Sequence, residues 1–86
     1  MDVPFDIQYT PEALRLMNDR MILKSDVAQV LTALRETDEA IFDEETGLSI
    51  TRARLGNVTF WVKYEEIEDG YLVIGAYSHR MGIAVR

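Results

Sequence analysis

The feature that most constrains the fold is a pair of alternating, aromatic-rich runs in the C-terminal part of the chain. They are Val58–Tyr64 and Tyr71–Met81, separated by a short acidic stretch that ends in Gly70. Such runs, joined by a turn that contains Gly, predict a long β-hairpin. The hairpin holds the only Trp and the only His of the chain, so we expect the functional chemistry to lie on it.

Alternation along this hairpin predicts one face turned toward the core and one turned away. The core-facing set is Val58, Phe60, Val62, Tyr64, Leu72, Ile74 and Ala76. A three-residue loop at 68–70 places this whole set on one side of the sheet, whereas a two-residue loop at 69–70 would divide it. Burial of the whole apolar set on one side therefore favours the three-residue loop. Trp61 is then a neighbour of Tyr77, and Thr59 a neighbour of His79.

A second hairpin is predicted just before the first. The run 48–55 is rich in β-branched residues, and Gly56-Asn57 is suited to a two-residue turn. That turn pairs Arg52 with Trp61 and Arg54 with Thr59 on the side away from the core. We call the resulting surface the open face; its predicted members are Arg52, Arg54, Trp61, Lys63, Tyr77 and His79. The apolar Phe42, Leu48 and Ile50 are expected to share it.

The N-terminal half reads as one short strand and two helices. Phe5–Tyr9 alternates like a strand, and Thr10-Pro11 predicts the start of a helix at about 11–20. A second helix is expected to be capped at Ser25 and to end near 35–37, and 39–42 is a further strand candidate. The prediction is a single α+β domain spanning 1–86, with the order β-α-α-β-β-β-β. Both helices would pack on one face of an antiparallel meander sheet of four to five strands.

Composition narrows the classes of function. The chain has no Cys, which excludes disulfides and thiolate metal sites and suits a reducing cytoplasm. One His and acidic clusters without ligand spacing predict neither a metal nor a cofactor. A net charge of −6 disfavours binding to nucleic acid, and no apolar run is long enough to predict a membrane span. We therefore expect a cytoplasmic protein.

Three functions fit the open face. Trp, Tyr and Arg concentrate at protein interfaces, which favours binding of a protein partner or of a second copy as a homodimer. Arg beside Trp would also suit an anionic small molecule. His79 would provide acid–base chemistry near neutral pH, so an enzyme is the rival class. A lone His is more often structural, so the residues favour a non-catalytic role.

Several short motifs resemble a known bacterial domain. They are Met21-Ile-Leu-Lys-Ser-Asp-Val27, Glu45-Thr-Gly47, Gly56-Asn-Val-Thr-Phe-Trp-Val-Lys-Tyr64, Asp69-Gly-Tyr71 and Ala76-Tyr-Ser-His-Arg-Met81. The domain occurs mainly in anaerobes, alone or appended to flavin- and iron–sulfur-containing pyridine-nucleotide oxidoreductases. The resemblance implies an accessory or interaction role beside such an enzyme. It implies no flavin or cluster in this chain, which lacks Cys and a dinucleotide motif.

The order of elements also resembles the RelE-like toxin superfamily, especially its BrnT-like members. Ser78-His79-Arg80 stands where those proteins carry a Ser-x-Arg-like sequence on the last strand. This resemblance implies a ribonuclease or translation inhibitor, with Lys63, Tyr77, His79 and Arg80 as candidate catalytic residues beside Arg52 and Arg54. Such toxins are usually basic, whereas this chain carries −6, and that difference disfavours RNA cleavage.

Overall fold

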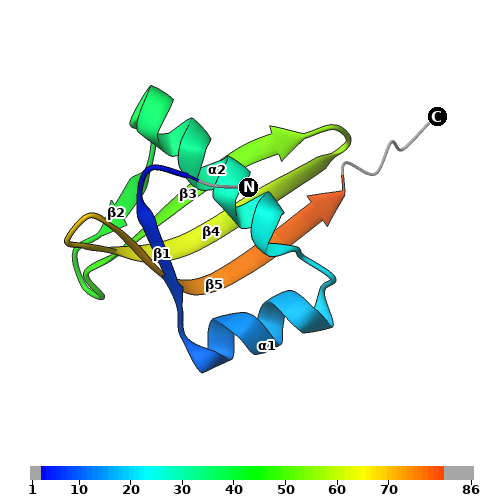
Figure 1. Cartoon of the computed structure of the whole chain (residues 1–86), viewed down its shortest axis with the longest axis horizontal. Helices are drawn as coiled ribbons and strands as arrows, with labels where there is room; N and C mark the ends of the chain where they lie inside the picture. Colours follow the sequence, from blue (N-terminus) through cyan, green and yellow to red (C-terminus); the bar gives the residue numbers. More distant parts are fainter. Residues whose placement is uncertain (1–2, 81–86) are drawn as a thin grey trace.

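The computed structural model describes residues 3–80, except for the side chain of Arg80. Its elements are β1 (Asp6–Tyr9), α1 (Pro11–Asp19), α2 (Lys24–Thr37), β2 (Ile41–Asp43), β3 (Leu48–Leu55), β4 (Val58–Ile67) and β5 (Gly70–Arg80). The strands form one five-stranded sheet in the order β1-β5-β4-β3-β2 (Figure 1). The fold is therefore α+β, with two helices and a mixed sheet.

Local sequence explains both helices. The hydroxyl of Thr10 accepts a hydrogen bond from the N–H of Ala13 at 3.0 Å, and Pro11 begins α1, as predicted. The predicted cap at Ser25 is wrong, because α2 begins at Lys24, two residues before the start that a cap at Ser25 would give. Leu23 takes the N-cap position, and its N–H donates to the carboxylate of Asp26 at 2.9 Å. The first-turn acid therefore secures this start.

The prediction of a wholly antiparallel sheet is wrong at one strand. β2 to β5 form an antiparallel meander, but β1 pairs parallel with β5, with Asp6–Tyr9 opposite Gly70–Val73. Parallel neighbours require a long crossover connection, and the helices and the meander between them supply it. β1 thereby places Ile7 and Tyr9 against the core.

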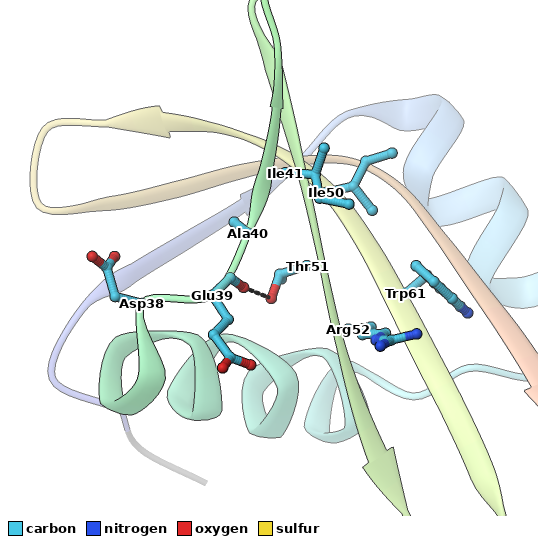
Figure 2. Close-up of a pocket in the computed structure, with 8 residues that line it drawn as sticks. All are labelled: Asp38, Glu39, Ala40, Ile41, Ile50, Thr51, Arg52 and Trp61. Atoms are coloured by element: carbon cyan, nitrogen blue, oxygen red, sulfur yellow. Dashed lines mark hydrogen bonds between the residues drawn. The ribbon is translucent and has the colours of Figure 1, made fainter.

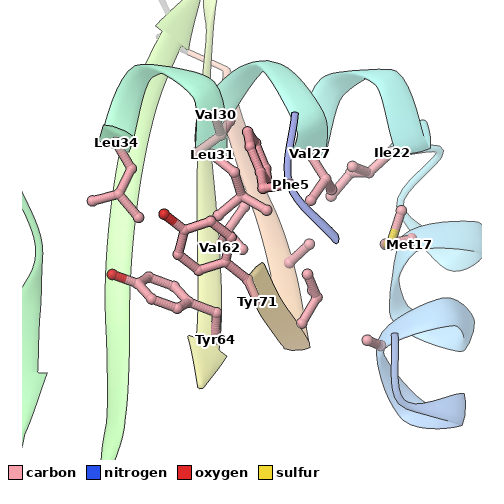
Figure 3. Packing of buried hydrophobic residues seen from close by; sticks show 13 residues of the cluster. Phe5, Met17, Ile22, Val27, Val30, Leu31, Leu34, Val62, Tyr64 and Tyr71 are labelled. Carbon is pink, nitrogen blue, oxygen red and sulfur yellow. The ribbon is translucent and has the colours of Figure 1, made fainter. Parts of the chain in front are cut away.

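The core lies between α2 and the sheet. Val27, Val30 and Leu31 of α2 are buried together with Val62 and Val73 of the sheet (Figure 3). Tyr71 joins this cluster to its neighbours, with its ring edge-to-face with Phe5 at 5.4 Å and with Tyr64 at 5.2 Å.

α1 departs from the expectation that both helices cover one face. It lies along the β5 edge of the sheet, whereas α2 crosses the face (Figure 1). Ala13 and Met17 of α1 still enter the core. β1 pairs with only the first four residues of β5, so α1 covers much of the edge that β1 leaves free.

The predicted loop of the last hairpin is also wrong, although most of its predicted register is correct. Ile67 pairs with Gly70, which leaves a two-residue turn, Glu68-Asp69, with Asp69 at φ 67°. A bulge then shifts the pairing by one residue, because Lys63 faces Gly75 while Tyr64 faces Val73. Tyr71 and Val73 are therefore buried, and the predicted core residues Leu72 and Ile74 are not. Ala76 is buried as predicted.

Candidate interaction surface

The structure assembles the predicted open face on the side of the sheet opposite α2. The pairs Arg52–Trp61 and Arg54–Thr59 across β3 and β4 are confirmed. Trp61–Tyr77 and Thr59–His79 across β4 and β5 are confirmed as well. Lys63 lies opposite Ile50 on one side and Gly75 on the other. The bulge lies beyond these rows, so it leaves them intact.

Two cations lie over the aromatic rings of this surface. The guanidinium carbon of Arg52 is 5.3 Å from the centre of the Trp61 ring. That of Arg20 is 5.3 Å from the centre of the Tyr77 ring. Sequence reasoning missed Arg20, because its place depends on α1 lying along the β5 edge and no local pattern reveals that.

Gly75 explains the pose of Tyr77. A Cβ on Gly75 would come 3.2 Å from the hydroxyl oxygen of Tyr77, so the phenol lies back over this glycine. Trp61, Lys63 and Tyr77 are half-buried, whereas Arg52, Arg54 and His79 are exposed. Flat rings with charged groups at their borders therefore form much of the surface.

Apolar residues extend the open face toward β2. Ile41 faces Ile50 across the β2–β3 pair and is 70% exposed. Leu48, one pleat from Ile50, shares this side as predicted. The placement of Phe42 on this face is wrong. Phe42 pairs with Ser49, which in turn pairs with the core residue Tyr64, so Phe42 turns to the other side.

A hollow of about 460 Å³ lies between β3 and residues 38–40, the segment that leads into β2 (Figure 2). It is lined by Asp38, Glu39, Ala40, Ile41, Ile50, Thr51, Arg52 and Trp61. The buried hydroxyl of Thr51 donates to the carbonyl oxygen of Glu39 at 2.9 Å and fixes the rim. With apolar walls and both charge signs at the rim, the hollow suits an apolar side chain better than an anion.

Two of the candidate catalytic residues, Lys63 and His79, lie apart along the strands, whereas the hydroxyl of Tyr77 lies over Gly75, the partner of Lys63. His79 lies in the row of Thr59, and Lys63 lies two rows further on, with the Trp61–Tyr77 row between them. Four strand residues span about 13 Å, which is beyond direct proton transfer between two side chains. Arg80 ends β5 opposite Val58, and its side chain lies outside the described part of the chain. Within residues 3–80 no group of three or more His, Asp or Glu could hold a metal ion.

No protein-family model, curated protein or solved structure matches this chain. Among the residues that the structure describes, no helix has both the length and the apolar character needed to cross a membrane.

Proposed function

We propose that this chain is a protein-interaction domain that binds its partner through the open face. One observation carries the proposal: within residues 3–80 no helix covers this face, yet it presents half-buried Trp61 and Tyr77 with arginines over their rings. Trp, Tyr and Arg are the residues that dominate binding energy at protein interfaces. The protein would be cytoplasmic and would act as an accessory domain beside an oxidoreductase of an anaerobe, as the motif resemblance suggests.

The two alternatives have less support. A toxin-type ribonuclease with a RelE-like sheet would need its catalytic groups within reach of one phosphate, and Lys63 and His79 are about 13 Å apart along the strand direction. An anionic small molecule in the hollow would meet Arg52, but Asp38 and Glu39 line the same hollow and would repel it.

Site-specific photocrosslinking tests the proposal. Thr59→p-benzoylphenylalanine places a photoreactive group on the open face, and Gln29→p-benzoylphenylalanine places it on the exposed outer side of α2. After irradiation in cells of the source organism, we expect a discrete covalent protein adduct from the first variant only. The adduct's mass and peptide map identify the protein attached.

Two results would contradict the proposal. One is a set of adducts that is the same from both positions. The other is an adduct that survives Trp61→Asp, which would place a charge in the middle of the surface. Thermal unfolding of each variant, followed by circular dichroism, separates loss of binding from loss of fold.

A further inference from the structure

Charge is distributed unevenly along the open face. The end nearest the Gly56-Asn57 turn carries Arg52 and Arg54, with His79 beside them. The other end carries Glu65, which pairs with Leu72, and Asp43, which pairs with Leu48. The ring of Trp61 shares the row of Arg52, and the next row holds the apolar Ile41 and Ile50 with the cation Lys63 beside them. The face is therefore cationic at one end, mixed in the middle, where Lys63 lies among apolar side chains, and acidic at the other end.

A two-fold axis can pair this face with itself in two ways. An axis parallel to the strands would bring the cationic end of one copy over the cationic end of the other. An axis in the plane of the interface and perpendicular to the strands exchanges the ends. It sets Arg54, in the outermost row of one copy, near Asp43 and Glu65 of the other, and it lays the Arg52–Trp61 row over the row of Ile50 and Lys63. The second arrangement is self-complementary, as a two-fold interface requires.

The size of the face suits a modest dimer. Four strands spaced about 4.8 Å apart, with about seven residues of 3.3 Å each, give a projected area on the order of 400 Å² per copy. Stable interfaces bury about 800 Å² of accessible surface per partner, and a corrugated face buries more than its projected area. A dimer of this extent is expected to dissociate on dilution.

From these features we infer that the partner of the open face is a second copy of this chain, packed sheet to sheet with its strands reversed. The cationic end of each copy then lies over the acidic end of the other. The inference rests on the proposed function and names the partner of that surface. Aligned sheet packing tolerates the twist of both sheets, because their strands cross at about 30°.

Sedimentation across a concentration series tests the inference with charge reversals. The variant Arg52→Glu/Arg54→Glu makes both ends acidic, and Asp43→Lys/Glu65→Lys makes both ends cationic. Each is expected to weaken the dimer at least about tenfold, because close interfacial charge pairs are strongly coupled. The fourfold variant that combines them is expected to recover dimerisation, since the two ends again match. An equimolar mixture of the two double variants is expected to form a heterodimer.

The control is Lys24→Glu/Arg35→Glu, which changes the net charge by the same amount on α2, on the other side of the sheet. It is expected to dimerise like the wild type. The fluorescence of the single Trp reports the face used, and it is expected to shift to shorter wavelength as the dimer forms.

A monomer at every concentration overturns the inference, and so does a dimer that only the control variant weakens. A fourfold variant that stays monomeric and folded excludes the reversed-strand arrangement. A monomer that still gives an open-face adduct with a different protein leaves the proposed function standing. A chain that stays monomeric and forms no specific adduct contradicts both the dimer and the proposed function.

Discussion

Gly70 is the residue where the two ends of the fold meet. A Cβ at this position would lie 1.9 Å from the carbonyl oxygen of Asp6, so β1 packs directly on a bare backbone. We expect Gly70→Ala to lower the free energy of unfolding by about 3 kcal/mol, because β1 and β5 must separate to admit the methyl group. Urea denaturation followed by circular dichroism measures this.

Gly56→Ala is the matched control for Gly70→Ala. Gly56 has φ +68° but open space around a Cβ, so its substitution should cost only about 1 kcal/mol of local strain. Equal losses at the two glycines would contradict the steric role assigned to Gly70.

Tyr64 is expected to make the fold less stable at alkaline pH. Burial of its phenol raises its pKa above the ordinary 10.0, with smaller effects that include a hydrogen bond with Ser49, which lowers it. The unfolded chain then loses this proton at lower pH than the folded chain, so the free energy of unfolding should fall as pH rises above about 10. Urea denaturation at pH 9 and pH 11 measures the loss.

Tyr64→Phe should make that loss smaller. Burial also raises the pKa of Tyr9, so part of the loss is expected to persist in the variant. A variant whose stability falls with pH as steeply as the wild type would contradict the role of Tyr64.

At the scale of elements, β2 is the strand held least firmly. It has three residues, all of them exposed, and it pairs only with the first three residues of β3. The hydrogen bond from Thr51 to Glu39 fixes the chain just before β2 begins. We expect Thr51→Val to lower the free energy of unfolding by about 1 kcal/mol and to raise the hydrogen-exchange rates of the β2 amides more than those of β4.

Thr59→Val, the same substitution on the open face, is the control for Thr51→Val. It should leave the exchange rates of the β2 amides unchanged. If both variants affect β2 alike, the bond to Glu39 does not anchor the strand.

The elements that could be predicted from the sequence are those that a local motif marks. Thr10-Pro11 marked the start of α1, and Gly56-Asn57 fixed the register of β3 against β4. The bulge in β5 could not be predicted, because residues 71–74 are all apolar, so that Tyr71 and Val73 suit the core as well as Leu72 and Ile74 do. The three-residue loop was predicted wrongly because Gly70 was expected to take the positive φ. Asp69 takes it instead, and Gly70 is needed for the close contact with Asp6.

At the scale of the whole molecule, the part of the open face that could be predicted is the part that depends on the register of the two hairpins. Six predicted residues came from three consecutive strands, whose register depends on short loops. Arg20, the edge position of α1 and the parallel β1 depend on contacts between segments far apart in the sequence. The bulge in β5 turns Leu72 to the open face, whereas Glu65 reaches that side by alternation along β4, after Trp61 and Lys63.

The parallel pairing of β1 with β5 also bears on how the chain is made. Residues 6–9 leave the ribosome before their partners at 70–73, which must emerge before the two strands can pair. Until then α2 has no complete sheet to cover its apolar side, so the emerging chain exposes Val27, Val30 and Leu31. The domain therefore completes its fold only after β5 has emerged, and until then these apolar side chains are open to non-native contacts.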